Sequence, residues 1–358
     1  MKQISVILLL IGFSCSTSST KNKSLIISFT DVCIPIEGNQ LSLYLIGCTY
    51  SVNQSTSFYG YNNLQHKFDV FDLKNAKYVR SIEMDEFGPE GISNIETFGV
   101  IKDDVLVIKE SSRIVKLGDS ISIFKLKPDS SYHLKNGFSL DEYTIISKIF
   151  DGIDIDSEQN LYFSLLSKDQ KFPFVKINTN NKTLSLIPFE NPKEYKVANY
   201  GYKMYPTIEL GKDGLVINYN FSSKIYLYDE STEGIKSYNL KSSFTENETP
   251  PLSGEDLRDI PKRVDYHLNE LNFYGVRYDK YRNLYLRVHQ DKRESEVDKQ
   301  NIYLTIISSD FRKMDEIKLP DKVKPYFEIG EEGIYFPVEP KDESHLCFKL
   351  LTFEDPNN

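Results

Sequence analysis

The stretch that decides the fold is FDGIDIDSEQNLYF, from Phe150 to Phe163. Its pattern predicts one strand over Ile149 to Ile155, a polar turn over Asp156 to Asn160, and a second strand that opens on Leu161. Hairpins of the same form recur in IETFGVIKDDVLVI, YPTIELGKDGLVINY, NFYGVRYDKYRNLYLRV and YFEIGEEGIYFPV. Further short strands follow each hairpin, as in IYLYDE and GIKSYNL. The repeating unit is therefore four antiparallel strands.

Six such units follow one another along the chain. Their second strands contain Phe58, Leu106, Leu161, Leu215, Leu284 and Ile334, at spacings of 48 to 69 residues. Four strands repeated at this period are typical of a β-propeller. We therefore expect an all-β fold, a single six-bladed β-propeller of four-stranded antiparallel blades over residues 24–358. A pair of β-sandwiches is the alternative, but it does not explain the regular repeat.

The two ends of the chain are expected to meet in one blade. The last unit supplies only three strands, whereas an isolated strand at Leu25 to Val32 precedes the first unit. This N-terminal strand can complete the last blade, which closes the ring and removes its free edges. Leu41 to Ile46 is then expected to form a strand at the start of the first blade.

One segment departs from the repeat. Residues 241–272 separate the fourth and fifth units, and we expect a polar loop followed by a short helix with Pro261 at its first position. Val264, Leu268 and Leu271 fall on one helical stripe. The pattern predicts that this stripe packs onto the propeller.

The N-terminus reads as a targeting segment. Residues 1–14 combine Lys2 with the apolar run Ile4 to Ile11, as in a secretory signal peptide. Cys15 follows directly, so we expect it to carry a lipid, with residues 15–23 as a polar tether. The alternative is an ordinary cleaved signal with an accidental Cys. Later apolar runs are too short to span a bilayer.

Composition narrows the partners and the redox state. A net charge of −9 argues against nucleic acid as a partner. An exported chain meets oxidising conditions, so Cys33, Cys48 and Cys347 are expected to give one disulfide and one free thiol. Ring closure would bring Cys33 beside Cys347, and a register shift of one residue would separate them.

Few residues carry a chemical signal. The loop Asp85 to Gly91 reads as a glycine-dependent turn. The five histidines have no metal-binding spacing, and no catalytic motif occurs, so no metal or cofactor is expected.

The candidate ligand-binding residues are expected on one face of the ring. We call it the top face, the side from which the innermost strand of each blade starts. The insertion, with Arg263 and His267 on one side of its helix, should meet Arg287 and His289 there. This basic corner would favour a carboxylate or other anionic ligand, and Tyr219 would offer a flat face to a sugar or an aromatic group. In the competing interpretation, Arg287 pairs with a neighbouring blade and polar groups cap His289.

The signal segment ending in Cys15, the motif EFGPEG and the stretch YDKYRNLYLR together resemble uncharacterised six-bladed propeller lipoproteins of Bacteroidetes. The resemblance implies an outer-membrane setting and no known catalytic residues. Surface export in that group uses an acidic run after the Cys, which Ser16 to Thr20 lacks, so the periplasmic side is favoured.

The expected function is a lipid-anchored, non-enzymatic module of the bacterial cell envelope. It would bind a glycan, a peptide or an envelope protein on the top face. The alternative is a hydrolase or lyase with its site at the mouth of the central channel, and a third possibility is a structural subunit of an envelope complex. Convergence of acidic residues, Arg and His in the channel would favour the enzyme.

Overall fold

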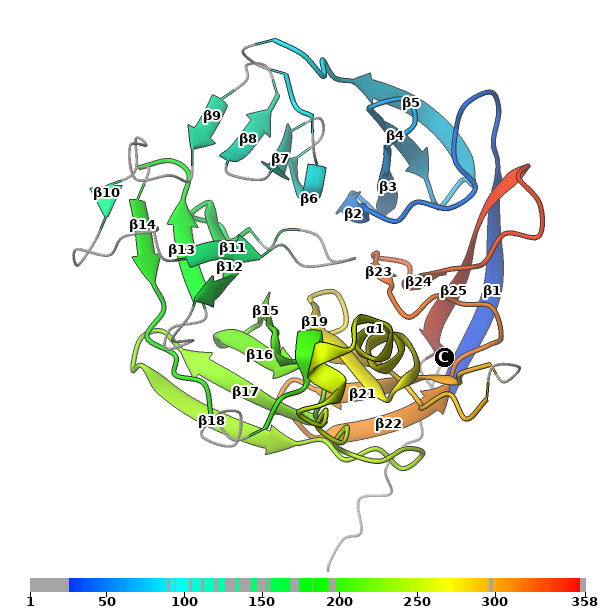
Figure 1. Cartoon of the computed structure of the whole chain (residues 1–358). Helices are drawn as coiled ribbons and strands as arrows, with labels where there is room; N and C mark the ends of the chain where they lie inside the picture. The colour runs from blue at the N-terminus through cyan, green and yellow to red at the C-terminus, as the bar shows by residue number, and fades with distance from the viewer. Residues whose placement is uncertain are drawn as a thin grey trace, which may run out of the picture.

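The computed structural model describes residues 26–88, 91–93, 95–102, 105–110, 113–118, 122–125, 133–134, 143–146, 153, 155–167, 174–181, 183–192, 198–295 and 299–354. The predicted signal peptide, the lipidation site Cys15 and the tether lie outside these residues. Six sheets stand in a ring around a common axis (Figure 1). The fold is a six-bladed β-propeller, as predicted.

The first three blades follow chain order from the innermost strand outward. Blade 1 consists of β2 (Gly47–Val52), β3 (Ser55–Asn62), β4 (Lys67–Asp72) and β5 (Lys77–Glu83). Blade 2 consists of β6 (Ile95–Lys102), β7 (Val105–Glu110), β8 (Arg113–Leu117) and β9 (Ser122–Lys125). Blade 3 consists of β11 (Tyr143–Ile146), β12 (Asn160–Ser167), β13 (Phe174–Asn178) and β14 (Thr183–Leu186). A two-residue strand, β10 (His133–Leu134), pairs with β14 at its outer edge.

The other blades repeat the pattern, and the last one uses both ends of the chain. Blade 4 consists of β15 (Pro206–Leu210), β16 (Leu215–Tyr219), β17 (Lys224–Asp229) and β18 (Gly234–Asn239). Blade 5 consists of β19 (Asn272–Asp279), β20 (Leu284–Gln290), β21 (Ile302–Ser308) and β22 (Lys313–Lys318). Blade 6 consists of β23 (Glu328–Ile329), β24 (Ile334–Pro337), β25 (His345–Glu354) and β1 (Ile26–Pro35). The six predicted second strands are all present.

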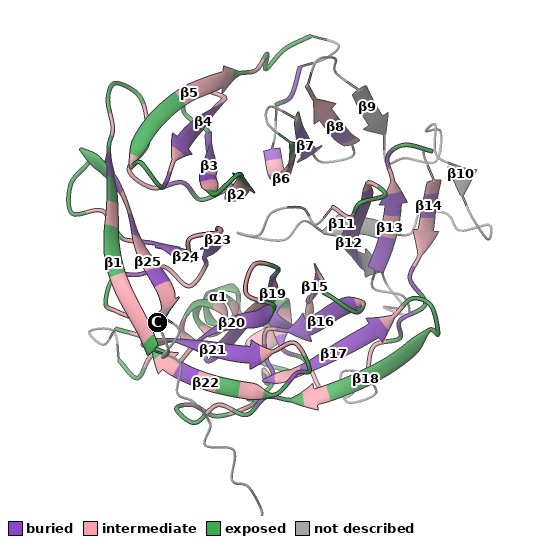
Figure 2. Ribbon diagram, turned by 180° about the vertical axis from the view of Figure 1, so that it is seen from behind, coloured by how far each residue is buried: buried purple, intermediate pink, exposed green. Residues whose placement is uncertain are grey.

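The core lies between the blades. Middle strands such as β16 and β17 are buried on both faces because each blade packs against its two neighbours. Figure 2 shows this gradient, with buried middle strands and exposed outer strands such as β5 and β18. Large aromatic side chains, including Phe68, Phe98 and Phe174, fill the space between sheets.

Ring closure is as predicted. Strand β1 pairs with β25 over ten residues, from Ile26 opposite Glu354 to Pro35 opposite His345. Cys33 stands directly opposite Cys347, and a disulfide joins them. Cys48 is the free, buried cysteine, and burial raises the pKa of its thiol. Because strands alternate in direction across blade 6, Ile26 lies at the end opposite to the top face.

The predicted strand over Leu41 to Ile46 is wrong, because the innermost strand of blade 1 begins at Gly47. The chain bends there so that the Tyr44 ring can enter the core, where its hydroxyl donates to Asp69 at 2.6 Å. Gly60 makes room for this ring, since a Cβ atom at that position would lie 2.5 Å from it.

Most of the first strand predicted for the hairpin over Phe150 to Phe163, Ile149 to Ile155, lies outside the described residues. Strand β11 lies at Tyr143–Ile146, and Ile155 forms a single bridge with Leu161. Residues 147–152 and 154 lie outside the described residues. The polar turn is present, because the Asp156 carboxylate accepts hydrogen bonds from the backbone of Glu158 and Asn160, both at 2.9 Å.

The insertion forms a loop, the short helix η4 (Asp256–Arg258) and the helix α1 (Ile260–Asn269). Asp259 caps α1 by accepting a hydrogen bond from the Lys262 amide, and Pro261 stands in the first turn. Helix α1 lies in front of the strands in Figure 1 and behind them in Figure 2, so it covers one face of the ring, the top face. No described helix is both long and apolar enough to cross a membrane.

The predicted packing of the α1 stripe is wrong. Val264 and Leu268 are 47% and 60% exposed, and Leu271 is buried but lies beyond the end of the helix. The inward face carries polar and aromatic side chains instead, and the Tyr266 hydroxyl donates to the Pro250 carbonyl. Hydrogen bonds therefore attach the helix to the rest of the protein, and its aliphatic side chains face solvent.

Candidate functional site

A hollow of about 700 Å³ lies on the top face, where the insertion meets blades 4 and 5. Its wall comes from the first part of the insertion, from the end of α1 and from the loop that follows β20. The lining residues are Tyr200, Phe244, Thr245, Glu246, Glu248, Thr249, Pro250, Pro251, Glu270, Leu271, Asp291, Lys292 and Glu294. We call this hollow the insertion pocket.

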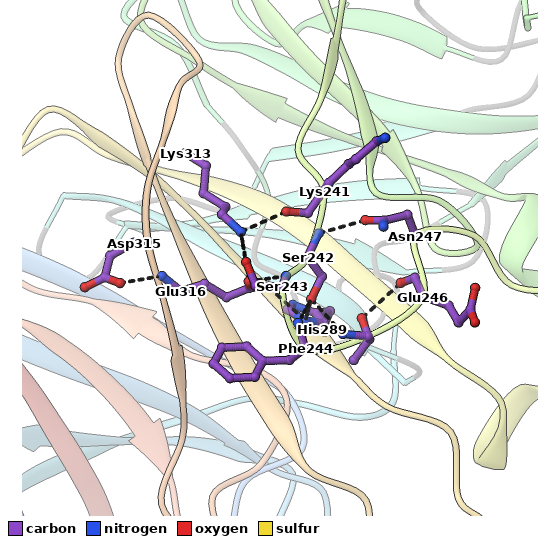
Figure 3. Close-up of polar contacts among 11 residues, drawn as sticks. Lys241, Ser242, Ser243, Phe244, Glu246, Asn247, His289, Lys313, Asp315 and Glu316 are labelled. Atoms are coloured by element: carbon purple, nitrogen blue, oxygen red, sulfur yellow. Dashed lines mark hydrogen bonds and ion pairs between the residues drawn. The ribbon is translucent and has the colours of Figure 1, made fainter.

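Blade 5 fixes the turn that opens the insertion (Figure 3). The Ser242 hydroxyl lies 3.1 Å from Nε2 of His289, and the Ser243 amide donates to the Glu316 carboxylate at 2.6 Å. Nζ of Lys313 donates to the Lys241 carbonyl at 2.9 Å and to the Ser243 hydroxyl at 2.8 Å. These bonds hold the backbone immediately before Phe244 in one place.

Phe244 is the exposed end of a row of stacked rings. Its ring lies 4.8 Å from that of Tyr303 with planes 11° apart. The row continues from Tyr303 to His289 at 5.1 Å and from His289 to Phe273 at 5.4 Å. The Arg287 guanidinium then lies 4.9 Å from the Phe273 ring centre. Phe244 is 53% exposed, so one face of a fixed aromatic ring remains open to a ligand.

Acidic side chains dominate the pocket lining. Five carboxylates line it, and Lys292 is the basic residue among its described lining residues. Nζ of Lys292 lies 3.0 Å from the Glu270 carboxylate, so part of that charge is balanced within the pocket. A pocket that contains both carboxylates and an open aromatic face favours ammonium and guanidinium groups.

The base of the pocket is rigid. Tyr200 stacks on Phe221 at 3.9 Å and donates to Glu248 at 3.0 Å; burial and this bond raise its pKa to about 12. Nearby, Lys203 is fully buried and donates to the carbonyls of Glu270 and Leu271. Burial lowers the pKa of Lys203 to about 7. These contacts fix the end of α1 against blades 4 and 5.

Three of the predicted ligand-binding residues lie in the interior. Tyr219, Arg287 and His289 are 1%, 2% and 1% exposed. The Tyr219 hydroxyl donates to Asn191, so the open ring face expected there is absent. This corrects the predicted role of Tyr219 as a flat surface for a sugar.

Arg287 connects two blades, as in the competing interpretation. It donates to the Tyr219 carbonyl at 3.1 Å and to the Ser222 carbonyl at 2.8 Å, both in blade 4, and to the Tyr274 carbonyl at 3.1 Å. His289 lies 3.3 Å from Glu316. The basic residues of β20 therefore bind protein groups and support the insertion from below.

Arg263 and His267 lie on the inward side of α1. The His267 ring centre is 5.7 Å from that of Tyr202, and burial lowers the pKa of this imidazole. Both residues belong to the top-face side, as predicted, but neither lines the insertion pocket. The sequence did not predict the other residues of this candidate site, Phe244 and the acidic residues of the pocket. The available signal was an isolated aromatic residue within the polar run FTENETPP.

The central channel holds a second polar cluster. At the mouth opposite the top face, a hollow of about 600 Å³ is lined by Glu209, Arg277 and residues from all six blades. Glu209 accepts a hydrogen bond from the Tyr278 amide of the next blade at 3.0 Å, and Glu328 accepts one from the Thr49 amide at 3.1 Å. Arg277 lies 3.7 Å from Glu328. These charges therefore connect adjacent blades.

No histidine belongs to the described lining of this channel mouth. Across the described part of the chain, no group of three or more His, Cys, Asp or Glu residues is arranged to hold a metal ion.

A family model described as a domain of unknown function, DUF4221, matches residues 16–318. The chain belongs to the DUF4221 family. It is similar to the crystal structure of a DUF4221 member from Bacteroides vulgatus, with a TM-score of 0.74, 16% identity, and coverage of 94% of this chain and 100% of that one. The predicted resemblance is thereby confirmed for family and fold.

The fold is also similar to the crystal structure of a protein from Bacteroides fragilis that is predicted to be exported. Its TM-score is 0.56 at 13% identity, covering 92% of this chain and 96% of that one. No curated protein shows significant similarity to the sequence. At these identities the structural matches establish the propeller fold alone.

Proposed function

We propose that this DUF4221 protein is a lipid-anchored, non-enzymatic binding module of the bacterial cell envelope. Its insertion pocket would bind a cationic group presented by a glycan, a peptide or an envelope protein. The observation that carries the proposal is the open face of Phe244, held by the ring row in a pocket that five carboxylates also line.

The charge of the proposed ligand is opposite to the one expected from the sequence. Arg287 and His289 turn inward and bind protein groups, whereas Glu246, Glu248 and Glu294 are exposed. An ammonium or guanidinium group can lie over an aromatic face and pair with carboxylates at once. An anionic ligand would meet repulsion from the same carboxylates.

Several observations support the envelope setting. Residues 1–14 have the pattern of a signal peptide, and Cys15 follows them directly. The Cys33–Cys347 disulfide suits an oxidising compartment. The related protein from Bacteroides fragilis is predicted to be exported. We place the protein at the outer membrane, facing the periplasm. The tether would join the propeller at Ile26, opposite the top face, which leaves the insertion pocket pointing away from the membrane.

The binding function is favoured over the hydrolase or lyase alternative by the state of the channel. Glu209, the buried carboxylate that lines its mouth, and the nearby buried Glu328 accept backbone hydrogen bonds across blade boundaries. A general acid or base needs a proton to exchange with substrate. Carboxylates that accept hydrogen bonds between blades fit a structural role better than a role in proton transfer.

The test compares matched probes that differ only in charge. Chitosan oligomers carry free amines and chitin oligomers carry acetylated ones, and lysine-containing peptides can be paired with their glutamine analogues. We expect the wild-type protein to bind the amine-bearing member of at least one pair in isothermal titration calorimetry. Phe244→Ala and the double variant Glu246→Gln, Glu294→Gln should each weaken binding about tenfold, a loss of about 1.4 kcal/mol.

The control is Phe87→Ala, because Phe87 is 82% exposed and lies in a loop outside the insertion pocket. This variant should bind as the wild type does. Equal binding of the charged and neutral probes, or equal losses in Phe87→Ala and Phe244→Ala, would refute the proposal.

A further inference from the structure

A second hollow, of about 570 Å³, lies on the top face between blades 5 and 6. Five basic side chains line it: Arg293, Lys299, Lys318, Lys322 and Lys324. Two carboxylates, Asp321 and Glu339, lie among them. This basic groove stands out in a protein whose net charge is −9.

The four lysines of the groove do not stabilise the fold through ion pairs. Among the described residues, Lys299, Lys318, Lys322 and Lys324 form no ion pair with a carboxylate. Elsewhere in the same blade, Lys313 pairs with Glu316 at 2.9 Å and Arg282 pairs with Asp279 at 2.5 Å. Positive charges left together without partners raise the local potential and cost free energy through mutual repulsion. An anionic ligand would relieve that repulsion.

The groove is fixed by backbone bonds rather than by its charges. The Leu319 amide donates to the Ile302 carbonyl at 2.8 Å, and the Lys324 amide donates to the Pro337 carbonyl at 2.8 Å. Gln290 and Gln300 join across the loop by a side-chain bond of 2.7 Å. Lysine side chains can therefore be replaced there without removing the bonds that shape the groove.

One loop separates the groove from the insertion pocket. In the segment after β20, Gln290 and Arg293 line the basic groove, whereas Asp291, Lys292 and Glu294 line the acidic pocket. Two sites of opposite charge thus share one wall on the top face. Each would reject the ligand of the other through like-charge repulsion.

We propose that the basic groove binds a ligand bearing several carboxylate or phosphate groups, such as an acidic polysaccharide or a polyphosphate. Four of the five cations are lysines, which act as compact, mobile point charges and lack the planar fork of arginine. That composition suits a flexible chain of repeated negative charges. A single group held in one geometry would suit arginine better.

The test uses two probes that share negative charge and differ in chemistry, polygalacturonate and polyphosphate. Binding would be measured by isothermal titration calorimetry on the folded mature protein at about 50 and about 200 mM salt, because screening weakens such contacts. We expect binding of at least one probe that weakens with salt. The double variant Lys318→Gln, Lys324→Gln should weaken it about tenfold.

The matched control is Lys77→Gln, Lys236→Gln, which removes the same charge from exposed positions on the outer strands β5 and β18. It should bind as the wild type does. Binding of only one probe would identify carboxylate or phosphate as the recognised group. The proposal fails if neither probe binds at the lower salt concentration, or if both double variants lose affinity equally. Binding of chitosan by the insertion pocket is a separate readout, so the two proposals can fail independently.

Discussion

Phe244 lies almost flat on Tyr303, with ring centroids 4.8 Å apart and planes 11° from parallel. The contact joins a residue of the insertion to a residue of blade 5. Tyr303 in turn leads through His289 and Phe273 to Arg287 in the interior. The shape of the exposed site therefore depends on side chains that no ligand can reach.

Replacing Arg287 should reduce stability. Arg287→Ala would leave three buried carbonyl contacts without their donor and open a cavity between blades 4 and 5. We expect the free energy of unfolding to fall by about 3 kcal/mol, measured by urea denaturation. Arg312→Ala is the control, because that side chain is 80% exposed. Unchanged stability with lost ligand binding would instead assign Arg287 to the binding site.

His289 should make stability depend on pH. Burial lowers its folded-state pKa to about 4, against 6.5 in the unfolded chain. Between these values the unfolded chain takes up a proton that the folded protein does not, so stability is present above pH 6.5 and is lost as pH falls toward 4. The contribution is on the order of a few kcal/mol at most, because the Glu316 carboxylate opposes the shift.

The variant His289→Phe keeps a ring between Phe273 and Tyr303 but removes the titrating group. Unfolding free energies of the wild type and this variant would be compared at pH 7 and pH 4.5. We expect the variant to lose less stability on acidification. Parallel curves for the two proteins would show that His289 does not carry the effect.

The disulfide should contribute strongly because it closes a loop of 314 residues. Removing it with Cys33→Ser and Cys347→Ser should lower stability by about 6 kcal/mol in the chain-entropy account. Thermal melting with and without a reductant would test this. Reductant should lower the wild-type melting temperature to that of the double variant and leave the variant unchanged. Insensitivity of the wild type to reductant would contradict the prediction.

The proposed lipid anchor would depend on Cys15. The variant Cys15→Ala should move the protein from the membrane fraction to the soluble fraction of a cell lysate, because a lipid chain needs the thiol. Ser16→Ala, which changes the next residue and keeps the thiol, should remain in the membrane fraction. Continued membrane association of Cys15→Ala would argue against the lipid anchor.

The sequence predicts the blades well because their signal is local. Leucine, isoleucine and phenylalanine recur at strand period around Leu161, Leu215 and Leu284, and the turns between them are polar. The closure of the ring follows from the number of strands, because the last unit has only three and the N-terminal strand can supply the fourth. The sequence allows two registers for the closing strand pair, one that places Cys33 opposite Cys347 and one that separates them. The structure has the first of these registers.

The site was harder to predict than the fold, because the groups that each side chain contacts come from distant parts of the sequence. Arg287 and His289 alternate with apolar residues as ligand-binding residues would, yet their partners are carbonyls and a carboxylate from other segments. Val264 and Leu268 have helical spacing, but hydrogen bonds from Tyr266 and Lys203 decide which side of α1 faces the ring. Phe244 carries no periodic signal.

Pairing of β1 with β25 also has a mechanical consequence. If the proposed tether is present, a force applied through it would enter the propeller at Ile26 and run along the length of β1. Ten paired residues would then carry the load in shear together, so their hydrogen bonds would not open one after another. If those bonds yielded, the covalent link at Cys33 would transfer the force to β25. A protein held by one end and bound at the opposite face would thus resist being pulled apart.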